Sequence, residues 1–399
     1  MKLPIVYTAV FAMLLQQALS TMSGLTIPVL APPIAAETGL SPSLVGLYTA
    51  FLYGGSMISS LAGGGFLLRF GALRVSQFCL VIVAIGLLIN APGLTALFVI
   101  GALITGLGGG PSTPASSQIL ARYAEPSKAP LIFSIKQTGV PVGGIIAGAL
   151  LPFYVSLLGW RGAILCAALM ALILALLLQP LRKEFDSDRQ PQRSLKLTDI
   201  RATLIAVLRD KRIRDLAMGL FAFTGLQLAF ASFFVSFLSL GLGWKLTDAG
   251  IAYSIAMAAG VIGRLIWGWV GTKFVSPLML LAILGFAMGL SHMAIGLVTP
   301  GWQTVAVWGV AFLYGLTGIG YQGVLLAEIA RVSPPGMAGV ITGGAVFFAY
   351  VGMIMLPAAF GLILAVLDSY RIAFFILGGI PIVVSVMLMH SALQPSHRT

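Results

Sequence analysis

Twelve apolar segments, each long enough to cross a bilayer as a helix, constrain the fold of this 399-residue chain more than any other feature. Only 9% of the residues are charged and 59% are hydrophobic, a balance that excludes a soluble globular domain. The segments lack the alternating pattern of membrane-spanning strands, so we expect an all-α polytopic membrane protein. The segments cover residues 5–31, 43–68, 73–91, 94–121, 129–158, 161–180, 215–241, 247–272, 276–298, 302–330, 337–366 and 371–392.

A long polar stretch, residues 181–213, divides the segments into six and six. It holds nine basic residues against five acids, and its apolar residues from Leu197 to Leu208 are spaced as one face of a short amphipathic helix. We therefore predict an N-terminal six-helix bundle (1–180), a cytoplasmic linker with a surface helix (181–213) and a C-terminal six-helix bundle (214–399).

The Lys and Arg residues between the segments predict the orientation. With a cytoplasmic N-terminus, only Arg161, Lys245 and Arg371 face outward. The linker and the other basic residues then face inward, as the positive-inside rule requires: Lys2, Arg69, Arg74, Arg122, Lys128, Arg214, Lys273, Arg331 and Arg398. This distribution, rather than nucleic-acid binding, accounts for the formal net charge of +12. We expect a monomer in the lipid bilayer of the inner (plasma) membrane with both termini in the cytoplasm.

The two halves of the sequence repeat each other. Gly106-Leu107, Ala121-Arg122 and Pro126 recur at one constant offset as Gly315-Leu316, Ala330-Arg331 and Pro335. Two homologous six-span halves joined by a basic loop resemble the major facilitator superfamily (MFS). The resemblance implies two pseudo-symmetric bundles, with a substrate site midway between them and transport by alternating access.

The loop between the second and third segments departs from the best-known motif of that superfamily, G-x-L-x-D-R-x-G-R. Gly64, Arg69, Gly71 and Arg74 match it, but Leu68 occupies the position of the acid. The acid that would connect this loop to neighbouring helices is therefore missing. We still expect Gly64, Arg69 and Gly71 to take part in the conformational change.

A second group of conformational residues lies in the fifth segment. Gly139, Pro141, Gly143 and Gly144 resemble the glycine–proline signature of antiporters, although the match is imperfect. Glycines at this spacing allow another helix to approach closely, and proline can bend the span. In the tenth segment Glu328 lies three residues before Arg331, and we interpret the two as a gate pair or a helix-end ion pair.

Two cations lie inside apolar segments. Lys136 is about eight residues from the polar end of its segment and Arg264 is nine residues before Lys273, so both lie roughly 12–13 Å deep. A cation at that depth marks a functional site by default. The structural alternative is that each side chain reaches the headgroups or binds a helix-end carbonyl.

The two cations resemble those of monocarboxylate transporters and oxalate/formate antiporters, which use an arginine in the eighth span. The oxalate exchanger adds a lysine in the eleventh span. Arg264 matches the arginine, whereas Lys136 would mirror the lysine, because the eleventh-span position here is Ala345. Arginine binds a carboxylate with a planar fork and lysine adds a compact charge, so this resemblance implies a carboxylate substrate.

Polar side chains on other spans are expected to complete the binding site with the two cations: Gln17, Gln227, Tyr253, Tyr321, Gln322 and Tyr350. Nucleotide-binding, metal-binding and catalytic patterns are missing from the sequence, so we expect neither a cofactor nor an enzyme. The glycine-rich run before Pro111 lacks the Lys-Ser/Thr ending of a phosphate loop.

We therefore predict a secondary transporter of a small organic anion, working by anion exchange or by proton-linked co-transport. The first alternative is a carrier of an inorganic anion such as cyanate or nitrate. A multidrug or sugar exporter should carry buried acids rather than buried cations. A membrane receptor or sensor is the alternative outside transport. The substrate, the direction of transport and the coupling ion stay open.

Overall fold

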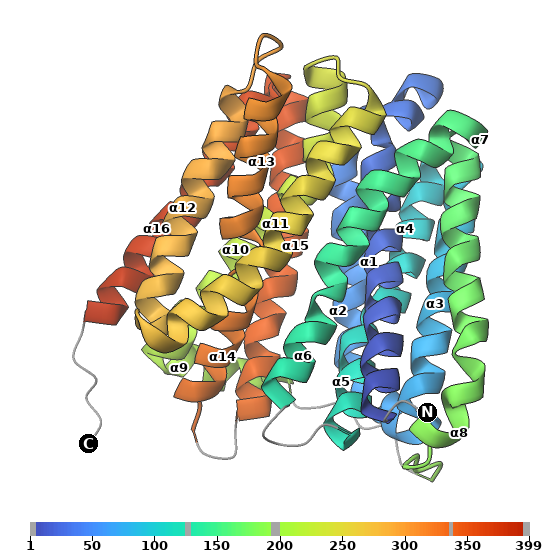
Figure 1. Ribbon diagram of the computed structural model, residues 1–399, viewed down its shortest axis with the longest axis vertical. Helices are drawn as coiled ribbons and strands as arrows, with labels where there is room; N and C mark the ends of the chain where they lie inside the picture. Colours follow the sequence, from blue (N-terminus) through green and yellow to red (C-terminus); the bar gives the residue numbers. More distant parts are fainter. Residues whose placement is uncertain (1–4, 124–128, 193–199, 335–337, 394–399) are drawn as a thin grey trace. The chain divides into compact units, whose positions relative to one another are not determined.

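The computed structural model describes residues 5–123, 129–192, 200–334 and 338–393, and over these ranges the chain is almost entirely helical (Figure 1). It forms two compact units. Unit 1 comprises Met1–Leu40 and Phe51–Thr198, and unit 2 comprises Ser41–Ala50 and Asp199–Thr399. The predicted boundaries of the linker, 181 and 213, stay a prediction.

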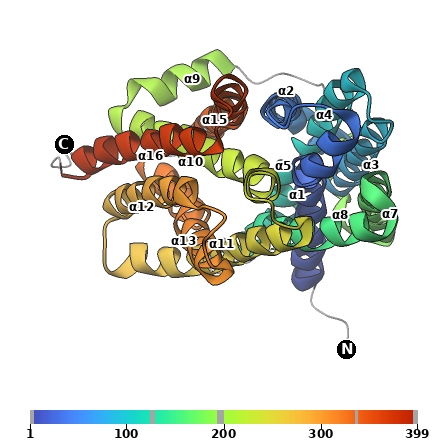
Figure 2. The same ribbon diagram turned by 90° about the horizontal axis from the view of Figure 1, so that it is seen from above.

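The helices of unit 1 are α1 (Ile5–Thr38), most of α2 (Leu44–Phe70), α3 (Ala72–Asn90), α4 (Thr95–Gly109), α5 (Ser112–Tyr123), α6 (Ala129–Gln137), α7 (Gly139–Leu177) and α8 (Arg182–Phe185). Those of unit 2 are α9 (Ile200–Arg209), α10 (Lys211–Ser236), α11 (Leu246–Lys273), α12 (Pro277–Leu297), α13 (Thr304–Gly318), α14 (Gln322–Val332), α15 (Ala338–Leu367) and α16 (Tyr370–Leu393). Within unit 2, α12 and α16 lie side by side (Figure 2). The short helix α9 lies where the amphipathic surface helix is predicted.

The number of spans agrees with the prediction of twelve. Among the described residues, ten helical runs are long and apolar enough to cross a membrane. One of them, Ile135–Phe185, contains two predicted spans, because Gly159 (φ 69°, ψ 176°) interrupts the helical backbone between them. Helix α2, with 27 residues, supplies the remaining span.

Three spans contain a short irregular turn within the apolar region, here called a break, although each remains one helical run. In the fourth span, Thr95–Tyr123, it separates α4 from α5 at Gly110-Pro111, and in the tenth, Thr304–Val332, it separates α13 from α14 at residues 319–321. Gly110 and Ile319 are separated by the same offset as Gly106 and Gly315, so the break is repeated in both halves. The fifth span has such a turn at Thr138, between α6 and α7, where the backbone keeps helical dihedral angles and the N–H of Val142 donates to the carbonyl oxygen of Thr138. Pro141 has no N–H to donate to the carbonyl oxygen of Gln137, so this turn lies where the proline removes a helical hydrogen bond.

Close packing of α7 against α1 positions the interior of unit 1. A Cβ atom on Gly143 would overlap the carbonyl oxygen of Ala18, and one on Gly139 would lie 2.8 Å from the carbonyl oxygen of Leu14. Only glycine permits this approach, as predicted for a pair of small residues. It places the middle of α1 directly beside the start of α7.

Gly143→Leu should destabilise the protein, because overpacking a close helix contact costs about 1–3 kcal/mol. We expect a lower melting temperature for the detergent-purified variant. Gly309→Leu on α13 is the matched control, since no atom lies within 4 Å of a Cβ at that position. Equal melting temperatures for the two variants would contradict the role of Gly143 in packing.

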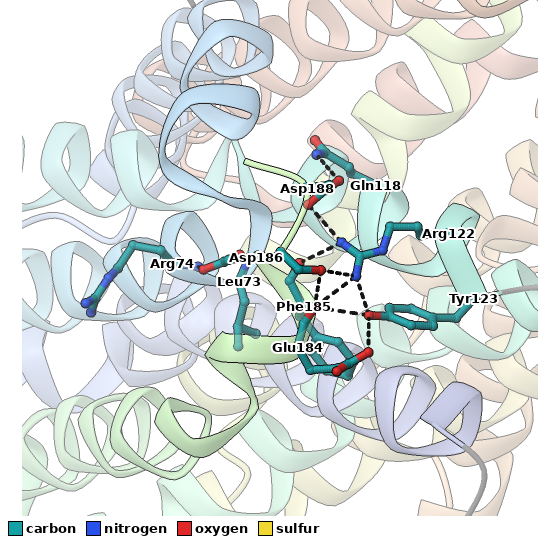
Figure 3. A network of polar contacts seen from close by, with 10 residues as sticks. Leu73, Arg74, Gln118, Arg122, Tyr123, Glu184, Phe185, Asp186 and Asp188 are labelled. Atoms are coloured by element: carbon teal, nitrogen blue, oxygen red, sulfur yellow. Dashed lines mark hydrogen bonds and ion pairs between the residues drawn. The ribbon is translucent and has the colours of Figure 1, made fainter. Parts of the chain in front are cut away.

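One end of unit 1 depends on a carboxylate from the segment after α7. The backbone N–H of Leu73 donates to Oδ1 of Asp186 (2.7 Å) and that of Arg74 to Oδ2 (3.1 Å), so Asp186 caps the start of α3 (Figure 3). Gly71, just before α3, has φ 96°, and a Cβ there would overlap the Asp186 carboxyl group. A side chain at position 71 would therefore be strained and would also displace the cap.

The same segment binds the end of α5. Arg122 forms an ion pair with Asp188 (Nη1–Oδ1 2.9 Å) and donates from Nη2 to the carbonyl oxygen of Glu184 (2.9 Å) (Figure 3). The phenol of Tyr123 donates to Oε1 of Glu184 (3.1 Å), and its ring packs on Phe185 with centroids 5.4 Å apart. Residues 184–188 thus connect the start of α3 to the end of α5.

Asp186→Ala should lower the stability of the protein by about 1 kcal/mol, the usual cost of losing a helix N-cap. Burial raises the pKa of Asp186 above its ordinary value, because this effect is larger than the opposite effects of the two backbone N–H groups and of Arg182. The acceptor oxygens therefore matter more than the charge, and Asp186→Asn, which keeps one of them, should be milder than Asp186→Ala. Thermal unfolding of the purified variants measures both effects. An Asn variant as unstable as the Ala variant would show that the charge is required.

Candidate functional site

Lys136 is buried inside unit 1. It lies on α6, near its end, with only 1% of its surface exposed. Its Nζ donates to the side-chain oxygens of Gln17 (3.0 Å) and Gln137 (3.1 Å). A lysine that extended to the headgroups would not have this burial, so the simplest structural alternative does not describe Lys136.

A polar layer between α1 and α5 orients the Gln17 amide. Oε1 of Gln17 also accepts a hydrogen bond from the hydroxyl of Thr113 (3.1 Å). The neighbouring Gln16 exchanges two hydrogen bonds with Ser112, at 2.8 and 3.0 Å. Ser112 and Thr113 begin α5 directly after the break at Gly110-Pro111, and the break therefore brings these hydroxyls to α1. The amide oxygen of Gln17 is consequently directed toward Lys136.

Arg264 in unit 2 lies beside the break between α13 and α14. Its Nη2 donates to Oε1 of Gln322 (2.8 Å), the first residue of α14, and its Nε lies 3.4 Å from the carbonyl oxygen of Ile319. The side chain is half-buried. The structural alternative therefore holds in part, because the guanidinium binds a helix-end carbonyl as well as a side chain.

Tyr321 extends this polar group along unit 2. Its buried hydroxyl lies 3.0 Å from that of Thr224 and donates to Oε1 of Gln227 over a longer distance of 3.4 Å. Tyr253, on α11, is fully buried, and its ring stacks on the ring of Phe230 with centroids 5.9 Å apart. Tyr253 therefore belongs to an aromatic cluster. The last predicted site residue, Tyr350, is half-buried on α15.

Glu328 and Arg331 form a two-pronged ion pair within α14. Both nitrogen–oxygen distances are 2.6 Å, from Nε to Oε2 and from Nη2 to Oε1. Glu328 is 1% exposed, whereas 49% of the Arg331 side chain is exposed. The geometry is that of a helix-end ion pair between residues one turn apart, the second of the two predicted interpretations.

The other predicted conformational residues are distributed over unit 1. Gly139, Gly143 and Gly144 are buried in α7. Arg69 is exposed near the end of α2 with its guanidinium carbon 5.6 Å from the centre of the Phe70 ring. Gly64 lies on α2, at a position whose burial the structure does not describe.

Two residues that bind Lys136 or Gln17 are missing from the predicted site, Thr113 and Gln137, and Asp186 is missing from the predicted conformational residues. Gln137 is adjacent to Lys136 in sequence, and Thr113 follows a glycine-rich run, so both carried a local signal. Asp186 lies in a short acidic run within a basic linker, but its partner α3 is more than 100 residues away, and no spacing in the sequence connects the two.

Known proteins similar to this chain are membrane transporters. A hexuronate transporter of Bacillus subtilis (strain 168) is 25% identical over 387 residues, covering 91% of this chain and 89% of the relative. Monocarboxylate transporter 11 of Mus musculus is 28% identical over 319 residues, covering 76% of this chain and 66% of the relative. The crystal structure of the nucleoside transporter NupG superposes with a TM-score of 0.78 at 14% identity, covering 97% of this chain and 100% of that one, which supports the fold alone.

The family model of the Major Facilitator Superfamily matches residues 12–357, most of the chain. This match agrees with the twelve apolar helices, the repeated break in the fourth and tenth spans, and the two compact units. The predicted resemblance is confirmed, and the protein is a transporter rather than an enzyme. The chain belongs to the Major Facilitator Superfamily of multi-pass membrane transporters.

Proposed function

We propose that this transporter carries a small organic anion with a carboxylate group, by alternating access, and that Lys136 and Arg264 bind the carboxylate. The observation that carries the proposal is the Lys136 ammonium group, 1% exposed inside unit 1 with amide oxygens at 3.0 and 3.1 Å. Amide dipoles stabilise an ammonium ion without cancelling its charge. A carboxylate that reached Lys136 would gain a charge-assisted hydrogen bond in a region of low dielectric constant.

The relatives support the same class of substrate. Transporters named for hexuronate, gentisate and monocarboxylates are among them, and all three names denote carboxylates. An anion transporter of Oryza sativa and a phosphate transport protein of Arabidopsis thaliana match over 39% and 36% of this chain. These shorter matches keep an inorganic anion as the second candidate.

The proposed mode of transport is anion exchange, or co-transport in which the proton arrives with the substrate. The basic linker and the Lys and Arg bias support a plasma-membrane carrier with both termini in the cytoplasm.

Lys136→Gln and Arg264→Gln should each weaken transport of the carboxylate by roughly 10- to 100-fold, since a hydrogen bond to a charged group contributes about 1.5–3 kcal/mol. Counterflow in proteoliposomes should be measured with glucuronate, gentisate, lactate, phosphate and cyanate. Lys273→Gln, an exposed cation at the end of α11, is the control and should transport normally. Normal carboxylate transport by Lys136→Gln would show that Lys136 does not bind the substrate. If the wild-type protein carries only the inorganic anions, the substrate is an inorganic anion and not a carboxylate.

Glu328→Gln should leave the response to a pH gradient intact, because both carboxylate oxygens of Glu328 already bind Arg331 at 2.6 Å. The measurement is uptake into proteoliposomes with and without an inward proton gradient. Proton-driven uptake that this one substitution abolishes would identify Glu328 as the coupling residue instead.

A further inference from the structure

Both cations within the apolar spans, Lys136 and Arg264, donate to the amide oxygen of a glutamine. In unit 1 the distance from Nζ of Lys136 to Oε1 of Gln17 is 3.0 Å, and in unit 2 the distance from Nη2 of Arg264 to Oε1 of Gln322 is 2.8 Å. The two pairs lie in separate units and on different helices, so they are independent observations of the same arrangement.

Each amide oxygen is fixed in its direction by the local structure. Oε1 of Gln17 accepts from Thr113 at 3.1 Å as well as from Lys136, and therefore two donors select the same end of the amide. Gln322 is the first residue of α14, next to the break at which Nε of Arg264 approaches the carbonyl oxygen of Ile319. Its side chain is thus presented to the guanidinium by the position of the break.

An amide oxygen is a weaker acceptor for a cation than a carboxylate oxygen, because the amide carries no net charge to attract the cation. It nevertheless avoids the large cost of a buried charge without hydrogen bonds. A glutamine in this place therefore stabilises the cation and can still be displaced by an anion. A glutamate would form a permanent ion pair and compete with the anion on equal terms.

We propose that Gln17 and Gln322 are stand-in ligands of the empty carrier: their amide oxygens bind Lys136 and Arg264 until a substrate carboxylate displaces them. This inference rests on the proposed function, since it takes the substrate to be an anion. It assigns the two glutamines a role opposite to that of ordinary substrate ligands. They oppose binding of the anion, and in this way they set its affinity.

The test compares the KM for counterflow of glucuronate and gentisate by the full-length protein in proteoliposomes. Gln17→Glu and Gln322→Glu should raise KM by roughly 10-fold or more, because a charged acceptor replaces a neutral one. Gln17→Met and Gln322→Met remove the acceptor at similar side-chain length and should lower KM, and an unchanged KM would show that the glutamines do not compete with the anion. If the Met variants instead raise KM, the glutamines are substrate ligands and the proposal is wrong.

Two controls separate this effect from added charge and from lost packing. Gln303→Glu adds a carboxylate at an exposed site before α13 and should leave KM unchanged. Gln16→Met removes the amide that binds Ser112 and should lower stability without lowering KM. Gln17→Asn, which withdraws the oxygen by one methylene group, replaces Gln17→Met if the latter fails to fold, and it should likewise lower KM.

The result also distinguishes failure of this inference from failure of the proposed function. Phosphate and cyanate are measured in parallel with the carboxylates. If the wild-type protein carries only these inorganic anions, the carboxylate proposal fails, but the same order of KM values among the Glu, wild-type and Met proteins still supports the stand-in role. If it carries only cationic or neutral probes, both proposals are wrong.

Discussion

The constraint on which the interior of each unit depends is the cost of placing a cation among apolar helices. A cation in that environment needs hydrogen-bond acceptors, and an intact helix offers few because its carbonyl groups already accept hydrogen bonds from backbone N–H groups. In unit 2 the chain supplies them at an irregular turn, where Arg264 binds the carbonyl oxygen of Ile319 and the side chain of Gln322. In unit 1 the acceptors of Lys136 are the amide oxygens of Gln17 and Gln137, and Thr113, which follows the turn at Gly110-Pro111, donates to Gln17.

The sequence was sufficient to predict the fold, because membrane spans follow from the length and composition of apolar segments. It was less informative about where spans break. Pro141 suggested an irregularity in the fifth span, and an irregular turn lies at Thr138, three residues before it. The turn at residues 319–321 in the tenth span contains no proline, so no residue there signalled it.

The candidate site could be predicted only in its residue types. Lys136 and Arg264 were recognisable because cations are rare in apolar segments. Their partners depend on which faces of distant helices meet. The approach of α7 to α1, set by glycines, decides that Gln17 rather than another polar residue reaches Lys136. The Asp186 cap likewise depends on a distant part of the chain. Gly71 could be recognised from the sequence as part of a motif, whereas the carboxylate beside it comes from a segment after α7.

The repeat clarifies which of these features the two halves share. Thr113 and Gln322 are separated by the same offset as Gly106 and Gly315, and each is a polar residue at the start of the helix that follows the break. The cations do not correspond: at the constant offset, Lys136 is matched by Ala345, which is fully buried. Thr113 acts on Lys136 through Gln17, while Gln322 binds Arg264 directly. The irregular turn is thus the feature that the two halves share. The cation comes from a different helix in each unit, α6 in unit 1 and α11 in unit 2.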